Sequence, residues 1–277
     1  MSDSTPPRAP LERGFEIYGV RVAVGASNRD VLDRLVALLP AGAKPCDPDT
    51  VDRRFILLTV GESIWRYENG NGRGLMLPDL ALVIPMLDGE LRRYVASKAA
   101  DRVFVHAGAV AYAGRAIVIP GQAFSGKTTL VAALARAGAV YYSDEYAVLD
   151  ERGFVHPYAR PLSIRQPDPL PNARHTVESM GGTVGEEPVP VGLIAATKYI
   201  PGADFSPERR SSAQGMLTLL AHATGVRERS AGSVAAVRGA ATSAVVIEGH
   251  RGEADAAAQA LLEIAGGAFP NGAGPGS

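Results

Sequence analysis

The segment AIVIPGQAFSGKTTL (residues 116–130) constrains the fold of this chain more than any other stretch. From Gly121 to Thr128 it has the pattern G-x-x-x-x-G-K-T, with apolar, strand-like residues before it and a helix-forming run after it. The two glycines let the backbone turn so that its N–H groups face phosphate oxygens at the N-terminus of a helix. The pattern therefore predicts a strand, a phosphate-binding loop and a helix, and with them an α/β fold.

Each residue of this loop has an expected part in nucleotide binding. Lys127 is placed to reach the β- and γ-phosphates of ATP, and the Thr128 hydroxyl to bind Mg²⁺. A purely structural glycine turn would not account for a lysine at the helix entrance. We expect ATP and Mg as cofactors, with the nucleotide held by Gly121, Gln122, Ala123, Phe124, Ser125, Gly126, Lys127, Thr128 and Thr129.

Two strand-like runs lead into the loop. RVFVHAGAVAY (residues 102–112) and RAIVIPG (residues 115–121) are separated only by Ala113 and Gly114, a short turn. The strand before the loop is therefore expected to have a hairpin partner. In ordinary doubly wound nucleotide-binding domains the loop instead follows the first strand of a βαβ unit.

Two adjacent acids follow in VYYSDEYAVLD (residues 140–150), which is predicted to be a strand. A strand that ends in an acid after the loop helix is the usual source of a second metal ligand in enzymes with such loops. Neighbouring side chains on a strand point to opposite faces, so only one acid can face the phosphates unless the strand has ended. We assign Asp144 as the base and as a metal ligand, and Glu145 as a supporting or metal-binding acid. The alternative is a pair of solvated acids at a strand end.

Residues 103–150 as a whole resemble the catalytic domain of HPr kinase/phosphorylase and its relatives. That family has a histidine on the strand before the hairpin turn, then the loop, then a pair of acids, the first of them seventeen residues after the loop lysine, as Asp144 is from Lys127. The resemblance implies a mixed-sheet P-loop kinase domain related to ATP-dependent phosphoenolpyruvate carboxykinase. It also implies transfer of the γ-phosphoryl group of ATP to a serine hydroxyl.

The resemblance implies roles for individual residues as well. His106 matches the family histidine and would act as a proton relay or a phosphate contact; its alternative is a histidine satisfied within the fold. Lys127 and Thr128 match the phosphate- and Mg²⁺-binding pair, and Asp144 matches the acid/base aspartate. Glu145 stands where the family usually has a second aspartate.

One family signature is missing from this chain. HPr kinases carry a glutamate followed by an Ile-Arg-Gly segment, whereas HPYARPLSIRQPD (residues 156–168) has no glutamate. Arg160 and Arg165 stand there instead and would stabilise transferring charge or bind an acidic substrate, or else pair with surface carboxylates. The departure argues against HPr as the acceptor and against the reverse phosphorolysis.

Other basic and histidine residues have weaker expectations. TKYIPGADFSPERR (residues 197–210) is expected to be a loop. Its Lys198, Arg209 and Arg210 would form either a solvated basic stretch or a substrate lid. The remaining histidines lack metal-ligand spacing and receive no role: His156, His175, His222 and His250.

The sequence predicts two folded regions between flexible ends. Residues 1–14 are expected to be a disordered leader and residues 267–277 a disordered tail, because both are rich in Pro, Gly or Ser. Residues 15–100 are predicted to form a small α/β module, and residues 101–266 the HPr kinase-like catalytic domain. In the module we expect one strand over residues 15–27, a helix capped by Ser27 or Asn28, and Trp65 and Tyr67 packed from a strand into a core.

Charge and cysteine content restrict the partners. The chain has 28 Lys and Arg against 29 Asp and Glu, so its net charge of -1 gives no global field for nucleic acid or an anionic membrane. No apolar run approaches the roughly 20 residues that a bilayer requires, and the polar start MSDSTPPRAP is unlike a signal peptide. The single cysteine, Cys46, excludes an internal disulfide. We expect a cytoplasmic protein without a nucleic-acid or membrane partner.

Three functions agree with these residues. The first is an ATP- and Mg-dependent kinase for a hydroxyl, on a serine of a peptide or protein; some relatives modify biosynthetic peptides such as lasso precursors. In it Asp144 takes the hydroxyl proton, Lys127 and Mg²⁺ neutralise the phosphates, and Arg160 or Arg165 supports the transition state. The alternatives are a kinase for a small metabolite and a non-catalytic ATP-binding regulatory module. HPr kinases are hexamers, so the resemblance also allows a homo-oligomer.

Overall fold

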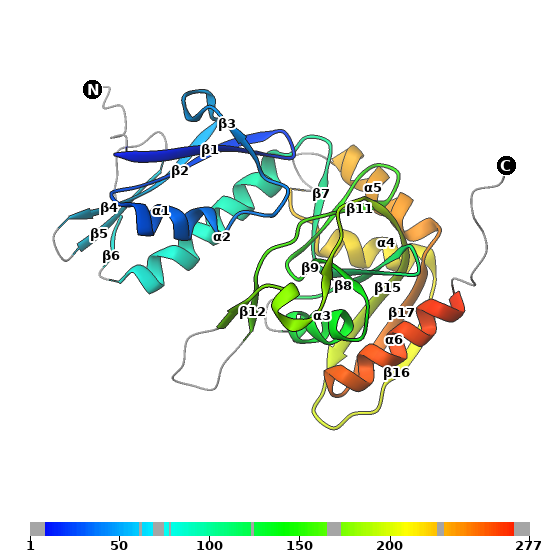
Figure 1. The fold of residues 1–277 in the computed structure, drawn as a ribbon. Helices are drawn as coiled ribbons and strands as arrows, with labels where there is room; N and C mark the ends of the chain where they lie inside the picture. Colours follow the sequence, from blue (N-terminus) through cyan, green and yellow to red (C-terminus); the bar gives the residue numbers. More distant parts are fainter. Residues whose placement is uncertain are drawn as a thin grey trace. The chain divides into compact units, whose positions relative to one another are not determined.

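The chain divides into two compact units, Met1–Ala100 and Asp101–Ser277. The structure, a computed structural model, describes residues 9–60, 63–68, 75–77, 79–122, 125–164, 173–225 and 230–268. Both units combine helices with a mixed β-sheet, so the α/β class predicted from the sequence is confirmed (Figure 1). No helix in these ranges is long and apolar enough to cross a membrane.

The first unit is built on a six-stranded sheet in the order β3-β1-β2-β4-β5-β6. Strands β2 and β4 are parallel, and the other neighbours are antiparallel. The strands are β1 (Leu11–Ile17), β2 (Val20–Ala26), β3 (Lys44–Cys46), β4 (Arg53–Val60), β5 (Ser63–Glu68) and β6 (Leu75–Leu77). Trp65 and Tyr67 lie on β5, but their side chains fall outside the described part of the structure.

Two helices pack on this sheet: α1 (Arg29–Val36) and α2 (Leu80–Lys98), with a short 3₁₀ turn, η1 (Pro48–Thr50), between them in sequence. Asn28 is the N-cap of α1, because its side chain accepts a hydrogen bond from the N–H of Val31. Helix α2 runs through Pro85 without an interruption, although proline removes one hydrogen bond of the helix.

The start of this unit differs from the expectation. The single strand predicted for residues 15–27 is the hairpin β1–β2, which turns at Tyr18 and Gly19, both with positive φ. Strand β1 already begins at Leu11 and pairs with β2 and β3, so the predicted leader of residues 1–14 is wrong for its last residues. Local composition suggested flexibility there, but pairing with β2 orders the backbone from Leu11 onward, and β3 adds a second neighbour at Gly14.

The second unit contains a nine-stranded sheet in the order β14-β9-β7-β10-β11-β15-β17-β16, in which β8 pairs with both β7 and β15. A separate pair of short strands, β12 and β13, lies outside it. The strands are β7 (Val103–Tyr112), β8 (Arg115–Pro120), β9 (Val140–Ser143), β10 (Tyr146–Leu149), β11 (Phe154–His156), β12 (Leu162–Ile164), β13 (Ala173–His175), β14 (Thr183–Val184), β15 (Val189–Tyr199), β16 (Ser206–Arg210) and β17 (Val245–Arg251).

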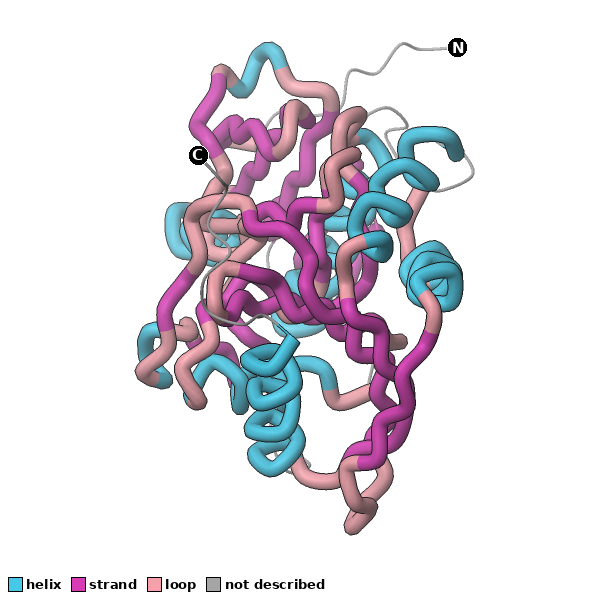
Figure 2. The backbone as a smooth tube through the Cα atoms, turned by 90° about the vertical axis from the view of Figure 1, so that its right-hand side faces the viewer, coloured by secondary structure: helices cyan, strands magenta, loops and turns pink. Residues whose placement is uncertain are grey.

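Helices cover both faces of this sheet (Figure 2). One buried cluster joins α3 and α6 to side chains such as Ile117 and Ile119 of β8. The other joins α4 and α5 to Val118 of the same strand, because side chains alternate between the faces. The helices are α3 (Lys127–Arg136), α4 (Ser212–Ala221), α5 (Ser230–Thr242) and α6 (Ala254–Ala268), with a 3₁₀ turn, η2 (Glu178–Met180).

The hairpin before the loop is present as predicted. Strands β7 and β8 pair antiparallel from Tyr112 and Arg115 onward, and the turn residues Ala113 and Gly114 both have positive φ. On its other side β8 pairs in parallel with β15. Strand β8, which carries the loop at its C-terminal end, is therefore held between two neighbours.

Three local expectations are wrong in this unit. The acid-bearing strand is broken into β9 and β10 at Asp144 and Glu145. Lys198 lies on β15, and Arg209 and Arg210 lie on β16, so these residues form paired strands and no lid. Helix α6 extends to Ala268, past the predicted start of the tail. The residues from 269 onward lie outside the described part of the chain.

Removing a fully buried side chain from α3 should test how strongly the loop helix depends on the sheet. Leu134 has no exposed surface, so Leu134→Ala should lower the free energy of unfolding of this unit by about 2–5 kcal/mol. Hydrogen-exchange protection of the α3 and β8 amides measures this unit separately from the other.

The matched control is Leu217→Ala on α4, where the side chain is 64% exposed and the expected change stays within about 0.5 kcal/mol. Equal losses of protection in the two variants would contradict the assigned packing of α3.

Candidate functional site

The predicted phosphate loop lies between the C-terminal end of β8 and the start of α3. Gly126 is the N-cap of α3 and has a left-handed backbone conformation, with φ 81° and ψ 17°. A Cβ on Gly121 would lie 2.8 Å from Ser125 Oγ, so this position is too close to the other side of the loop for a larger residue. Ala123 and Phe124 lie outside the described residues. Of the two glycines that the sequence singled out, Gly126 is favoured by its left-handed backbone, whereas a side chain at Gly121 would displace the Ser125 hydroxyl.

Lys127 turns back over the loop that precedes it. Its Nζ donates hydrogen bonds to the carbonyl oxygens of Gly121 (2.9 Å) and Gln122 (2.7 Å). The side chain is only 7% exposed, and burial lowers the pKa of the amine, whereas the carboxylates of Glu145 and Asp144 act in the opposite direction. Among the described residues no side chain caps α3, so its first N–H groups are open to an anion.

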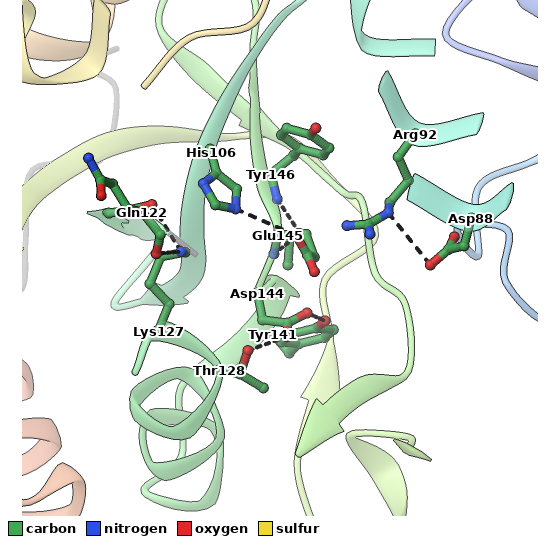
Figure 3. Close-up of polar contacts among 12 residues, drawn as sticks. Asp88, Arg92, His106, Gln122, Lys127, Thr128, Tyr141, Asp144, Glu145 and Tyr146 are labelled. Carbon is green, nitrogen blue, oxygen red and sulfur yellow. Dashed lines mark hydrogen bonds and ion pairs between the residues drawn. The ribbon is translucent and has the colours of Figure 1, made fainter. Parts of the chain in front are cut away.

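Asp144 is joined directly to the loop helix (Figure 3). The Thr128 hydroxyl donates to Asp144 Oδ2 at 2.8 Å, and the Tyr141 hydroxyl lies 3.0 Å from Asp144 Oδ1. Tyr141 Oη also lies 2.9 Å from the carbonyl oxygen of Arg160. Because a phenol has one proton, it can satisfy only one of these two acceptors fully at a time.

The environment of Asp144 disfavours its charged form. Only 5% of the residue is exposed; this burial, together with the nearby Glu145 charge, raises the pKa of the carboxyl against the opposing hydrogen bonds from Thr128 and Tyr141. Burial and the Asp144 charge also raise the pKa of Tyr141 well above its ordinary value. Asp144 is therefore a more basic carboxylate than an exposed one, as expected of a general base.

The break between β9 and β10 brings both acids to the same site. The Ser143 hydroxyl oxygen accepts hydrogen bonds from the N–H groups of Glu145 (3.1 Å) and Tyr146 (3.0 Å). This local turn replaces two residues of strand, so the alternation of side chains that would separate Asp144 from Glu145 no longer applies. Asp144 is hydrogen-bonded to Thr128 of the loop helix, and the charges of both carboxylates act to raise the pKa of the Lys127 amine.

His106 lies beside Glu145. Its Nε2 is 3.6 Å from Glu145 Oε2, and both side chains are about one-third exposed, at 29% and 34%. The His106 carbonyl accepts a hydrogen bond from the N–H of Gly121 at 3.3 Å, so strand β7 also holds the first residue of the loop. The histidine predicted from the family resemblance is thus adjacent to both the loop and the acid pair (Figure 3).

Of the two arginines predicted for the site in the segment after β11, the structure describes only Arg160. Arg160 is 9% exposed and contributes its carbonyl oxygen to Tyr141, which in turn contacts Asp144. Arg165 lies outside the described residues. Of the histidines given no role, His156 pairs with Asp150 at 2.9 Å, and His222 Nδ1 lies 2.9 Å from the Thr218 carbonyl oxygen.

Sequence reasoning missed two residues of the site. Tyr141 stands three residues before Asp144, and its hydroxyl could have been noted as a buried partner for the acid. Arg251, at the end of β17, contacts the loop carbonyls of Ser125 and Gly126. No local motif marks it, because the loop and the arginine are about 125 positions apart in the chain.

The arrangement fits a magnesium-bound triphosphate. Mg²⁺ prefers oxygen ligands and is usually held by one or two carboxylates, a hydroxyl, water and phosphate oxygens. Thr128 and Asp144 bring a hydroxyl and a carboxylate together at the start of α3, and Glu145 adds a second carboxylate nearby. Within the described ranges no group of three or more His, Cys, Asp or Glu residues is arranged to hold a metal ion by itself.

Comparisons of this chain with protein-family models, with curated proteins and with solved structures found no match.

Replacing Asp144 by Asn should stabilise the metal-free protein at neutral pH. The amide keeps an acceptor for Thr128 and can donate to Tyr141, but it removes a buried charge. Because the folded-state pKa of Asp144 is raised, the wild type loses stability relative to the variant as pH rises above the ordinary carboxyl pKa of about 3.9. We expect the variant to be the more stable of the two at pH 7, and its advantage to disappear at acid pH, where the carboxyl is protonated in both the folded and the unfolded state.

Thermal unfolding from acid to neutral pH, in a chelating buffer, measures this difference. Asp150→Asn is a control for which the pH dependence should have the opposite sign. Burial acts to raise the pKa of Asp150, but hydrogen bonds from His156 and from the N–H of Phe154 outweigh it and hold this pKa below its ordinary value. That variant should lose stability relative to the wild type as pH rises. A pH-independent difference for Asp144→Asn would show that the carboxyl is not desolvated.

Proposed function

We propose that this protein is an ATP- and Mg-dependent kinase that transfers the γ-phosphoryl group to a hydroxyl, with a serine of a peptide or protein as the acceptor. The observation that carries the proposal is the hydrogen bond between Thr128, on the loop helix, and the buried carboxylate of Asp144. This hydrogen bond brings the Thr128 hydroxyl, the expected Mg²⁺ ligand, next to Asp144, the expected base. A mixed-sheet P-loop kinase fold of the HPr kinase type is part of the same proposal, supported by the hairpin before the loop.

The phosphates would be held by the loop backbone, the open end of α3 and Lys127. The Lys127 amine now rests on the carbonyls of Gly121 and Gln122, so it is positioned at the loop and exchanges these neutral acceptors for phosphate oxygens. Because the amine is buried, its interaction with an anion is weakened little by solvent. Thr128, Asp144 and Glu145 would hold magnesium, which when bound neutralises charge on the phosphates.

Asp144 would accept the proton of the acceptor hydroxyl. As that oxygen forms its bond to the γ-phosphorus, the bond from this phosphorus to the β,γ-bridging oxygen breaks, and ADP leaves. The hydrogen bonds from Thr128 and Tyr141 orient the carboxylate, and burial raises the pKa of Asp144, so that it becomes a better proton acceptor near neutral pH.

Neighbouring residues would complete the site. Glu145 and His106 form a more exposed pair from which a proton can pass to solvent. Arg160, whose backbone carbonyl contacts Tyr141, would support the transferred charge with its guanidinium, in the role first considered for Arg160 or Arg165. The chemistry requires ATP, which together with a single cysteine fits a cytoplasmic location.

Asp144→Asn should remove phosphoryl transfer while leaving ATP binding nearly unchanged. Loss of a general base lowers the rate constant by about 10²–10⁴-fold, whereas the loop and Lys127 are untouched. Transfer is followed with radiolabelled ATP and Mg²⁺, and binding by calorimetry without Mg²⁺, which separates the base from the metal ligand. Asp150→Asn is the matched control and should transfer at the wild-type rate; unaltered transfer by Asp144→Asn would refute the assignment of the base.

The acceptor class can be found by incubating the protein with radiolabelled ATP, Mg²⁺ and cell extract. Label on a peptide or protein, lost on treatment with a serine phosphatase, is the expected result. Label on a small molecule would instead identify a metabolite kinase. Binding of ATP without transfer to any component would support the non-catalytic regulatory module, and the Asp144→Asn protein serves as the blank.

A further inference from the structure

Arg251 is a buried cation on the side of the loop away from the acids. It is the last residue of β17, which pairs in parallel with β15, and Arg251 lies opposite Tyr199. The residue is only 2% exposed. Strand β8 separates the two sides of the site, because β7 and the acids lie on one side of it while β15 and β17 lie on the other.

The guanidinium contacts the backbone of the loop from behind. Arg251 Nη2 donates to the carbonyl oxygens of Ser125 (3.2 Å) and Gly126 (3.0 Å). Its Nη1 lies 3.4 Å from the carbonyl oxygen of Gly252. A Cβ on Gly126 would lie 2.7 Å from Nη2, so the guanidinium fills the space that a side chain would need there.

The charge of Arg251 has no ion-pair partner among the described residues; burial lowers the pKa of the guanidinium, although nearby Glu253 acts against this effect. No carboxylate of the described residues forms an ion pair with it, and its buried Nε has no hydrogen-bond partner among them. The aromatic ring of Tyr199 lies with its centroid 5.4 Å from the guanidinium carbon, and the Tyr199 hydroxyl donates to Glu253. A buried cation without a direct ion pair is unfavourable for folding unless other groups compensate its charge.

The carbonyl contacts determine where the neighbouring N–H groups point. In a trans peptide the C=O and the N–H lie on opposite sides, so the Ser125 carbonyl directs the N–H of Gly126, and the Gly126 carbonyl directs the N–H of Lys127. Arg251 holds both carbonyls on its own side. The Gly126 carbonyl also accepts the hydrogen bond of Leu130 N–H, which aligns the same peptide with the axis of α3. Both N–H groups are therefore turned away from Arg251, toward the open end of the helix.

We propose that Arg251 is a positioning residue for the phosphate loop: by binding the Ser125 and Gly126 carbonyls it presents the N–H groups of Gly126 and Lys127 to the phosphates of the nucleotide. This inference rests on the proposed nucleotide binding. The bound phosphates in turn add negative charge near the buried guanidinium, which has no direct ion pair within the described part of the protein. Arg251 itself touches neither nucleotide nor acceptor.

Calorimetry with the full-length protein tests this role, with inorganic tripolyphosphate and with Mg-ATP as probes. Arg251→Met keeps the length of the side chain but removes the charge, and Arg251→Lys keeps the charge but not the two-carbonyl contact. We expect Arg251→Met to bind both probes about tenfold more weakly or worse, as for loss of a hydrogen bond to a charged group. Arg251→Lys should fall between Arg251→Met and the wild type. Arg210→Met on β16, which removes an exposed ion pair with Glu248, is the matched control and should bind normally.

Thermal unfolding separates positioning from a merely structural role. Without a probe Arg251→Met should melt at or above the wild-type temperature, because a buried unpaired charge is gone; saturating tripolyphosphate should raise its melting temperature less than that of the wild type. In transfer assays the KM for ATP should rise more than kcat falls.

The outcomes distinguish this inference from the proposed function. Wild-type protein that binds neither probe would refute nucleotide binding itself, and the inference with it. If the wild type binds and folded Arg251→Met binds equally well, the positioning role alone is overturned. Should Arg251→Met not fold, Arg251→Lys decides: weaker binding at an unchanged melting temperature supports the role, and wild-type affinity overturns it.

Discussion

The double pairing of strand β8 is the constraint on which the rest of the site depends. Its antiparallel contact with β7 and its parallel contact with β15 hold the strand in the middle of the sheet. Side chains of β8 are buried on both faces, against α3 and α6 on one and α4 and α5 on the other. The loop that follows β8 is consequently attached to a rigid support. Strand β7, one neighbour of β8, pairs with the two strands that flank the acids, and β15, the other neighbour, pairs with β17, which carries Arg251.

The break between β9 and β10 determines where the two acids lie. Ser143 closes a turn between β9 and β10, and the turn places Asp144 and Glu145 together at the loop. In a continuous strand, one of these carboxylates would point into the opposite face of the sheet. The turn at these two residues thus accompanies the acid pair: the Glu145 carbonyl still accepts from the N–H of Ala107 on β7, while the side chain of Ser143 accepts from the N–H groups of Glu145 and Tyr146.

Charges of both signs are buried around the loop: Lys127 and Arg251 against carbonyl oxygens, and Asp144 against hydroxyl donors. Each of these arrangements is less favourable for folding than an apolar substitute of the same size would be. Their common location around the start of α3 agrees with stability being given up locally for the proposed nucleotide site. The buried positions also keep solvent away, so the interactions of these charges with a phosphate are strong.

Local sequence determined the parts of this protein that depend on short-range backbone chemistry. The glycine pattern predicted the loop and the start of α3, the Ala113–Gly114 pair predicted the hairpin, and Asn28 predicted a helix start, because each requires only a turn geometry or a cap. The change of structural unit near residue 100 was also readable in the sequence, and the chain divides there.

Long-range pairing decided the rest. Leu11–Gly14 is ordered by its pairing with β2, and Arg209 and Arg210 belong to a strand because β17 pairs with it. The acid strand is broken at Asp144 and Glu145, although the residues on either side of the break pair with β7 in one register. Arg251 reaches the loop only because β17 lies two strands from β8 in the sheet. The sequence by itself therefore determined that a glycine-containing connection leads from β8 into α3, and which acids follow it. Only the tertiary structure decided that both acids face that loop and that a distant arginine supports it, since these contacts depend on strand order, which no local pattern encodes.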